Sequence, residues 1–581
     1  MISHAPRHDS AAAVPSCDRQ RRIAGGFAPS RALLRPLSAL REALMSWRAQ
    51  LFASGEGRAP AASRSRPGLT HGHIVILVSG VFLLSNALIA PALRPAVGLL
   101  VILGCAGSLY VVIRAVQGCG TGFLRSRIEP AIFAPCALAA IALCVLGGEG
   151  HFFFANYDWL TRDAVLADLV RQKFPVFYEY RGSEFVLRAP LGMYMIPAAI
   201  GKLLGLRAAH LALLAQNVTI LALTLSVLVS MVRGRKAVFL AVFLAFSGIE
   251  IIGAWIAGSR FPEPGAFPWP LQAHQHLAWW NPAFQYTNHV TQIFWVPNHA
   301  LPGWWLAALC ILQIRREIDS TALIVAFAFL FFWSPLTLAG ALPIVGYLVL
   351  RRHIGELLAP RLLAACAAAL CFLPIAIYLG ADAGSVPHRW LVVAAGFWAF
   401  YVVFIVIQIP HAAIVASFWS RLDPASRTLS ILSILVLLLV PFYRLGTNND
   451  FSMRASIMPL ALLAFVFGSI VADMQLRDGI RRIAAVAAII VLGCITSVFE
   501  IQRALMLNSF AISDCNLLTT WNHLEPDRWL ASYFARSDAM PAWLFPHDRV
   551  EAPVALENRQ CWLDHPFMNL PTTAWREPRL W

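Results

Sequence analysis

Long apolar blocks alternate with short polar connections from about residue 74 to about residue 499 of this 581-residue chain. A helix needs roughly 20 apolar residues to cross the ~30 Å hydrocarbon core of a bilayer, and many of the blocks approach that length. The pattern predicts an all-α polytopic membrane protein with about 13 transmembrane helices. The expected spans are 74–93, 96–113, 130–147, 209–232, 237–257, 292–314, 321–333, 336–350, 361–380, 390–412, 428–443, 455–473 and 483–499.

Two apolar segments do not fit a simple crossing. The two short pieces within 321–350 form either a hairpin broken around Ser334-Pro335 or one bent span. The segment 190–206 contains Pro190 and Pro197, and a crossing there would reverse the sidedness of every later loop. We therefore interpret this segment as an interfacial or re-entrant helix.

Composition supports a membrane protein, because 58% of the residues are hydrophobic and only 13% are charged, whereas about a quarter are charged in soluble proteins. The net charge of +15 reflects basic cytoplasmic connections, so we expect no nucleic-acid partner. Thirteen spans place all these connections on the cytoplasmic side, together with the N-terminus. The basic positions are Arg114, Arg125, Arg127, Arg233, Arg235, Lys236, Arg315, Arg316, Arg351, Arg352, Arg421, Arg427, Arg477, Arg481 and Arg482.

Three regions follow from this pattern. Residues 1–72 are rich in Arg, Ala, Ser and Pro and predict a disordered, basic cytoplasmic tail, unless they precede the true start of the chain. Residues 73–499 form the transmembrane domain, and residues 500–581 form a small extracytoplasmic C-terminal region. The loops 148–208, 258–291 and 444–454 lie on that same extracytoplasmic side, where we expect them to converge.

Cysteine usage predicts no metal site, because the chain lacks a CxxC pair and any Cys/His ligand spacing. Most cysteines fall inside apolar blocks, where they pack as small hydrophobic residues. Cys515 and Cys561 lie instead in the polar C-terminal region. They form either a disulfide, if that compartment is oxidising, or two free thiols.

The first large loop carries the strongest candidate chemistry. Asp158 and Asp163 follow the apolar end of a predicted span within the sequence NYDWLTRD, and acids are scarce in this chain. A carboxylate among apolar neighbours can act as a general base, so we take Asp158 first and Asp163 second as catalytic candidates. The alternative is that these acids cap a helix or pair with Arg162 and Arg171. Arg162 is itself a candidate for substrate binding.

Further along the same loop, Arg181 and Arg188 are candidates to bind a phosphate or diphosphate through paired hydrogen bonds. Their alternative role is to anchor the loop at the membrane interface.

The segment 281–305 contributes polar residues where a helix enters the membrane, namely His289, Asn298 and His299. Polar side chains at that depth cost free energy unless they have partners, which makes them functional candidates or members of a structural hydrogen-bond network.

The short loop 444–454 places four consecutive polar residues and two arginines between two spans. Asp450 and Arg454 are four residues apart, so they either pair on one helix or hold an anionic headgroup or a sugar. Asn449 belongs to the same candidate set.

These features together resemble the GT-C superfamily of integral membrane glycosyltransferases. The resemblance rests on an acidic first loop with Asp158 and Asp163 and on the run RAPLGMY at 188–194, followed by KLLGLRAA at 202–209. These runs are similar to the ArnT-like and protein-mannosyltransferase-like branches, with Ala189 at the place of a proline and two additional spans before the loop. A long series of spans and a polar C-terminal region complete the similarity.

The resemblance implies an inverting glycosyl transfer at the extracytoplasmic face of a bacterial inner membrane. An Asp of the first loop would accept the proton of an acceptor hydroxyl, and arginines such as Arg181, Arg188 or Arg454 would hold the phosphate of a polyprenyl-phosphate sugar donor. The acceptor is a lipid, a glycan or a protein. No cofactor is predicted, although some relatives use a divalent metal ion, which would then lie at Asp158. Two other functions stay open, an O-antigen-type ligase or polymerase and a lipid or sugar transporter.

Overall fold

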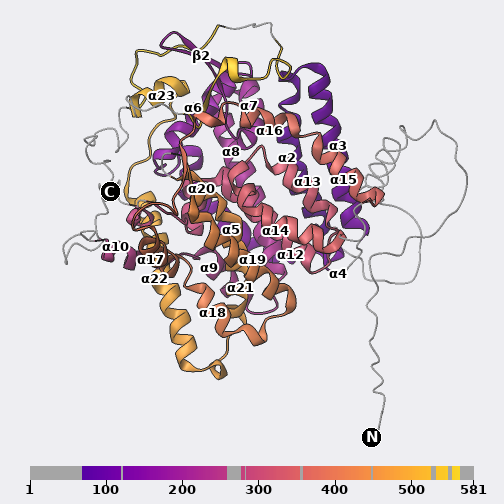
Figure 1. The fold of residues 1–581 in the computed structure, drawn as a ribbon, viewed down its shortest axis with the longest axis vertical. Coiled ribbons are helices and arrows are strands. Elements are labelled where there is room, and N and C mark those ends of the chain that lie inside the picture. Colours follow the sequence, from indigo (N-terminus) through magenta and orange to yellow (C-terminus); the bar gives the residue numbers. More distant parts are fainter. Residues whose placement is uncertain are drawn as a thin grey trace, which may run out of the picture.

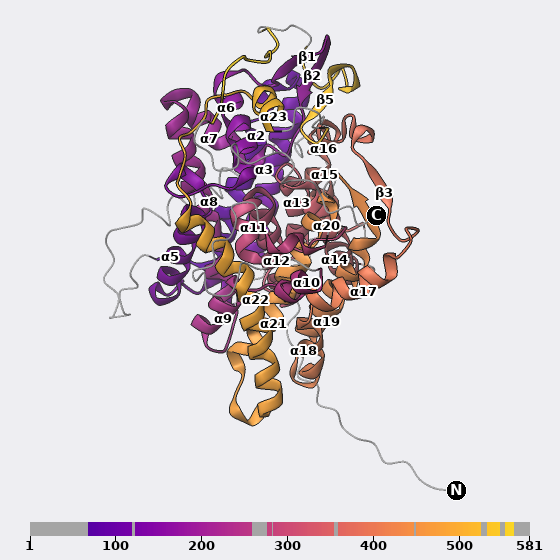
Figure 2. The same ribbon diagram turned by 90° about the vertical axis from the view of Figure 1, so that its left-hand side faces the viewer.

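The computed structural model describes residues 68–118, 122–257, 276–281, 283–353, 358–446, 449–524, 531–546 and 552–562. Nearly all of the predicted basic tail, 1–72, lies outside these residues. The described chain is mostly helical, with a bundle of long helices and a small sheet at one end (Figures 1 and 2). The strands β1, β2 and β5 and the helix α23 lie at that same end of the molecule.

The first half of the bundle runs from α2 to α12. Its helices are α2 (His71–Ala87), α3 (Pro95–Gly118), α4 (Gly122–Arg125), α5 (Pro130–Leu146), α6 (Tyr157–Arg171), α7 (Gly192–Leu204), α8 (Leu206–Ser230), α9 (Lys236–Leu244), α10 (Glu250–Ile256), α11 (His289–Trp295) and α12 (Pro297–Ile314).

The second half continues to α23. Its helices are α13 (Thr321–Leu330), α14 (Pro335–His353), α15 (Pro360–Leu370), α16 (Leu373–Gly380), α17 (Phe397–Gln408), α18 (His411–Ser417), α19 (Pro424–Leu439), α20 (Asp450–Ala455), α21 (Ile457–Asp473), α22 (Ile480–Met506) and α23 (Leu517–Leu524).

Seven helical segments of the described chain are long and apolar enough to cross a membrane, and an eighth arises if the bent pair α17 and α18 counts as one span. The seven are His71–Ala92, Pro95–Gly118, Leu206–Ser230, Pro360–Gly380, Pro424–Phe442, Asp450–Asp473 and Ile480–Met506. The described chain is therefore mostly helical and fits an all-α membrane protein with a few short strands.

The expected count of about 13 spans is wrong, because most of the remaining apolar blocks form short or broken helices. The block 130–147 forms the 17-residue α5, and 321–333 contains the 10-residue α13. The block 237–257 splits into α9 and α10, while 292–314 splits into α11 and α12. The segment 336–350 lies in α14, which is separate from α13 and is not among the seven spans.

Two of the breaks have a local cause in proline. A residue before proline avoids the α-helical conformation because the proline ring clashes with its backbone. Val296 precedes Pro297 and adopts φ −136° and ψ 50° between α11 and α12. Ile409 precedes Pro410 and adopts φ −126° and ψ 48° between α17 and α18, which are bent by 63°. Both blocks are predominantly apolar, with only a few polar residues, so hydropathy alone hides the breaks.

A small antiparallel sheet joins the first loop to the C-terminal region. Its strands β1 (Phe177–Tyr180), β2 (Ser183–Leu187) and β5 (Phe534–Arg536) lie in the order β1-β2-β5, and Val186 is paired with both Phe177 and Ala535. A second sheet pairs β3 (His388–Trp390) with β4 (Tyr443–Leu445). The two chain regions predicted to share the extracytoplasmic side thus pair directly.

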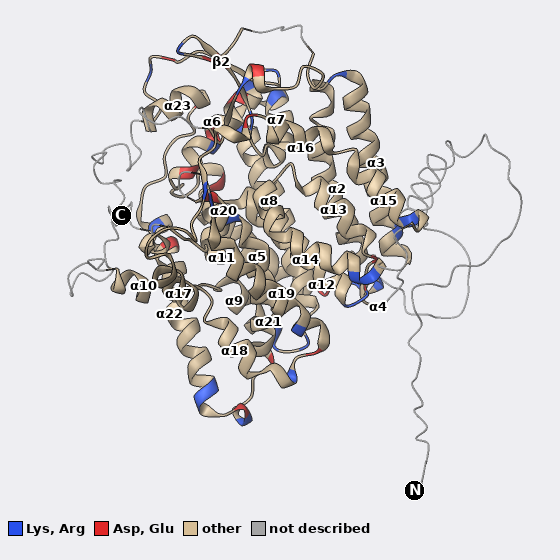
Figure 3. Cartoon of the chain, viewed as in Figure 1, with Lys and Arg blue, Asp and Glu red and all other residues tan. Residues whose placement is uncertain are grey.

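Charge is distributed unevenly over the bundle (Figure 3). Lys and Arg gather near α4 and at the foot of α22, at the end opposite the strands. Acidic and basic segments meet in the interior near α6 and α20. Those interior charges define the candidate site.

Candidate functional site

Helix α6 is fixed at its first turn by contacts with the end of α11. The Asn156 side chain accepts a hydrogen bond from the Asp158 backbone N–H at 3.0 Å and donates to the Phe294 carbonyl at 2.7 Å. The Trp159 indole N–H donates to the same carbonyl at 2.9 Å. Asn156 thereby caps α6 and ties it to α11, which aims the first two turns of α6 at the break between α11 and α12.

Arg162 is the centre of the site. Its side chain is 3% exposed, yet it donates to the Asn298 side-chain oxygen at 2.8 Å and to the Trp295 carbonyl at 2.7 Å. It also contacts the Asp158 carboxylate at 3.2 Å and the Tyr194 hydroxyl at 3.5 Å. Burial alone would lower the pKa of Arg162, but Tyr194 and Asp158 raise it, so this buried group stays a cation.

The carboxylate of Asp158 differs from Arg162 in exposure. Its side chain is 36% exposed, whereas that of Asp163 is 1% exposed. Of the two predicted catalytic acids, Asp158 is therefore the one that a substrate can reach without a rearrangement of the protein. The ion pair with Arg162, four residues along α6, holds that carboxylate in place.

A polar chain continues from Arg162 into the bundle. The Asn298 side-chain nitrogen lies 3.2 Å from His299 Nε2, and His299 Nδ1 lies 2.6 Å from the Ser334 hydroxyl. Ser334 in turn donates to the Thr337 hydroxyl at 2.6 Å. The predicted pair Asn298 and His299 is thus fully engaged in a buried network that orients Arg162.

Asp450 and Arg454 form an ion pair at 2.6 Å on α20, with side chains 19% and 20% exposed. The hydroxyl of Tyr533, from the C-terminal region, interacts electrostatically with this pair and with Arg162 and Asp158. Burial raises the pKa of Tyr533, which keeps its hydroxyl protonated. Among the described residues, the Nε atom of Arg454 has no hydrogen-bond partner. Tyr533 therefore lies close enough to both charge pairs to interact with their charges.

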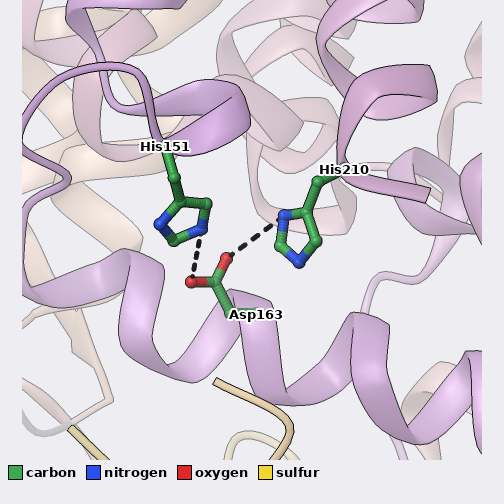
Figure 4. Close-up of side chains that lie close together, drawn as sticks. All are labelled: His151, Asp163 and His210. Carbon is green, nitrogen blue, oxygen red and sulfur yellow. Dashed lines mark ion pairs between the residues drawn. The ribbon is translucent and has the colours of Figure 1, made fainter. Parts of the chain in front are cut away.

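Asp163 lies on another side of α6, in a second buried cluster with His151 and His210 (Figure 4). The three residues come from the turn before α6, from α6 itself and from the start of α8. Sequence reasoning missed both histidines as site residues, because they are far apart along the chain and follow no ligand spacing.

The other predicted site residues lie apart from the Arg162 region or serve structure. Arg181 is exposed at the tip of the β1-β2 hairpin, over the Tyr180 ring. Arg188 is buried and donates to the Ala531 carbonyl at 2.6 Å. His289 packs between Phe243 and Trp304, with Nδ1 2.6 Å from the Phe243 carbonyl. Asn449 caps α20 and donates to the Ala283 carbonyl at 2.7 Å.

Sequence reasoning also missed a buried acid, Glu500, near the end of α22. Its carboxylate lies 2.6 Å from His276 Nδ1 and accepts from the Trp295 indole at 2.8 Å, with Arg503 at 3.3 Å. Trp295 is the residue whose carbonyl accepts from Arg162. Glu500 therefore supports the Arg162 region from behind, and the spacing of Glu500 and Arg503 by one helical turn was the signal in the sequence.

The C-terminal region is attached to the first loop by specific contacts. Asp168 on α6 accepts from the Tyr178 hydroxyl at 2.6 Å and from the Leu517 backbone N–H at 2.9 Å. Burial raises the pKa of Asp168 to about 7. The sulfurs of Cys515 and Cys561 are bonded in a disulfide, 2.09 Å apart. The region that supplies Tyr533 is thus held against α6.

Comparisons with protein-family models, with curated proteins and with solved structures found no match.

Proposed function

We propose that the protein is an integral membrane glycosyltransferase, which moves a sugar from a polyprenyl-phosphate donor to an acceptor hydroxyl. The observation that carries this proposal is the partly exposed carboxylate of Asp158, which is held by a buried cation and has Tyr533 and a second charge pair nearby. The membrane-spanning helices supply the setting that a lipid-linked donor needs. The GT-C resemblance of the first loop supports the same reaction class.

The reaction assigns a role to each group. Asp158 accepts the proton of the acceptor hydroxyl while the acceptor oxygen attacks the anomeric carbon of the sugar. The bond between that carbon and the phosphate oxygen breaks, and the polyprenyl phosphate leaves with its negative charge. Attack from the face opposite the phosphate inverts the anomeric configuration.

The two arginines divide the remaining work. The two terminal nitrogens of Arg162 donate to Asp158, Asn298 and Trp295, so Arg162 is a positioning residue for Asp158. The side chain of Arg454 is 20% exposed, against 3% for Arg162, so we assign to Arg454 the contact with the leaving phosphate. We propose that the reaction takes place toward the end of the bundle that carries the sheet, and that this end faces the extracytoplasmic side of a bacterial inner membrane.

The test is a transfer assay with the full-length protein in nanodiscs. Wild type, Asp158→Asn and the control Asp538→Asn are incubated with radiolabelled polyprenyl-phosphate sugars, and released polyprenyl phosphate is measured. Asp538 pairs with Arg536 on the surface, and its side chain is 64% exposed. Its variant is therefore a control for the same acid-to-amide change away from the site.

We expect release by wild type and by Asp538→Asn, and a loss of at least 100-fold in Asp158→Asn. Equal rates in all three proteins would remove Asp158 from the reaction. Movement of the labelled lipid across the membrane of proteoliposomes, without any sugar transfer, would contradict the enzyme proposal and favour a transporter.

A further inference from the structure

Three side chains from separate elements meet beside α6 and resemble a ligand set for a metal ion (Figure 4). His151 Nε2 lies 3.0 Å from Asp163 Oδ2, and His210 Nδ1 lies 3.9 Å from Asp163 Oδ1. One ligand atom from each residue falls within 4.8 Å of the other two. Among the described residues, this is the one such group of three His, Cys, Asp or Glu side chains.

These separations suit a small transition-metal ion. Zinc binds histidine nitrogen and carboxylate oxygen at about 2.0–2.2 Å, so tetrahedral ligand atoms lie roughly 3.3 Å from one another. The contacts of 3.0 and 3.9 Å bracket that value. Two imidazoles in the set favour zinc over magnesium or calcium, which prefer oxygen ligands.

Burial makes the cluster costly without a cation. The side chains of Asp163 and His210 are each 1% exposed, and that of His151 is 3% exposed. Oδ1 of Asp163 and Nε2 of His210 have no hydrogen-bond partner among the described residues. A buried carboxylate with incomplete compensation is unfavourable, and a divalent cation at its oxygens offsets that cost.

The orientation of His151 is fixed by the backbone. Its Nδ1 lies 3.2 Å from the Phe510 carbonyl, which only accepts hydrogen bonds, so Nδ1 carries the proton. In the neutral ring Nε2 then presents a lone pair toward the Asp163 carboxylate, an arrangement that repels unless a cation or a second proton lies between them. A carbonyl behind the non-ligating nitrogen is also the usual support of a metal-binding histidine.

His151 is held beside Asp163 by a turn with strained backbone angles. His151 has φ +60°, and the preceding Gly148 and Gly150 have φ +96° and +76°. A side chain at Gly148 would place its Cβ 2.5 Å from the Cβ of Ala155. The turn is therefore tight and needs glycine at these positions. Its unusual backbone angles place the imidazole of His151 beside Asp163.

We propose that His151, Asp163 and His210 bind one zinc-class transition-metal ion. Three protein ligands leave one coordination position for water or another group. The ion ties the turn before α6, α6 itself and the start of α8, and Arg162 adjoins Asp163 on α6. It thus fixes α6 from a side other than that of the Asn298 contact, independently of the reaction proposed above.

The experiment measures metal on the full-length protein purified in detergent through an affinity tag without histidine. Metal content is determined by mass spectrometry for wild type, His151→Gln, Asp163→Asn and His210→Gln. The matched control is His411→Gln, which changes a histidine that is 2% exposed in α18. Gel filtration selects folded protein before each measurement.

We expect about one zinc per chain in wild type and in His411→Gln, and less than about 0.2 in the three ligand variants. After chelation, wild type should regain thermal stability with zinc but not with magnesium, and its cobalt form should show the visible absorption of a tetrahedral site. His210→Cys keeps a ligand atom near the backbone and should retain the metal.

Two results would overturn the site. Wild type that takes up no zinc after chelation shows that a proton, not a metal, compensates Asp163. Full metal content in Asp163→Asn and His210→Gln places any bound ion elsewhere. Because the readouts are metal content and melting temperature, a failure of sugar transfer leaves these outcomes unchanged, and the two proposals stand or fall separately.

Discussion

The ion pair between Asp158 and Arg162 predicts that the two substitutions Asp158→Asn and Arg162→Gln are strongly coupled. Asp158→Asn alone leaves the buried guanidinium of Arg162 without its carboxylate neighbour. Arg162→Gln alone removes the cation and strips donors from Asn298 and the Trp295 carbonyl. The double variant removes both charges at once, so part of the cost of each single change should vanish.

The size of the coupling follows from the distance and the exposure. Two unit charges 3.2 Å apart, as here, attract by about 5 kcal/mol at an effective dielectric of ~20 and by about 1.3 kcal/mol in water. Asp158 is 36% exposed, so screening moves the value toward the lower figure. We expect a coupling of about 1–3 kcal/mol, on top of about 2–4 kcal/mol for the hydrogen bonds lost in Arg162→Gln.

The assay is reversible unfolding of the four proteins by SDS in mixed micelles, followed through the fluorescence of the chain's 19 tryptophans. Gly346→Ala, which meets no atom within 4 Å of its new Cβ, serves as the neutral reference. The double variant should be less destabilised than the sum of the singles and should still fail to transfer sugar.

Additivity of the two changes within about 0.3 kcal/mol would refute the claim that Arg162 holds Asp158 through charge. Transfer activity in the double variant would refute the role of Asp158 as the base, because that variant has no carboxylate at position 158.

Three further predictions concern packing, pH and the disulfide. Gly192→Ala should destabilise the protein by about 1–3 kcal/mol or more, because its Cβ would lie 2.1 Å from Trp333 Cδ1, and melting temperature against Gly346→Ala measures this. Burial raises the pKa of Asp168 from 3.8 to about 7, so the folded state holds a proton that the unfolded state releases, and stability should fall as pH rises from about 4 to about 7. Asp168→Asn should flatten that part of the profile of melting temperature against pH, and an unchanged slope would contradict the assignment. Reduction of Cys515–Cys561, 46 residues apart, removes a constraint of up to about 4 kcal/mol and should speed proteolysis of the C-terminal region, with Cys494→Ser as a control that leaves the rate unchanged.

Hydropathy located the long helices but could not show where apolar blocks break. The segments around Val296 and Ile409 read as continuous spans, because Pro297 and Pro410 are themselves apolar and prolines also occur inside membrane helices. Whether a proline kinks a helix or ends it depends on the neighbours that satisfy the freed backbone groups. That information lies in the packing, not in the local sequence.

The sequence named some residues of the candidate site as hypotheses, but not their partners, and it did not point to His151, His210, Glu500 or Tyr533. Scarce acids at the mouth of a span drew attention to Asp158 and Asp163, but Arg162 finds Asn298 at a distance of 136 positions along the chain. The sequence pattern also did not show that the two acids lie in two different clusters. Asp158 and Asp163 are five residues apart on a helix, so they lie on different sides of it. Only the fold shows that Asp163 lies beside two histidines and Asp158 beside an arginine.

The sheet that joins β5 to β2 has a consequence for the order in which the protein is made. The partner of Asp168, the Leu517 backbone N–H, is synthesised 349 positions later. The partner of the His151 ring, the Phe510 carbonyl, is synthesised 359 positions later. At a synthesis rate of about 5–20 residues per second, the first loop spends roughly 20–70 seconds without these partners. The site is therefore completed only when the last part of the chain leaves the ribosome, and an early stop anywhere in that interval yields membrane-inserted helices without a finished first loop.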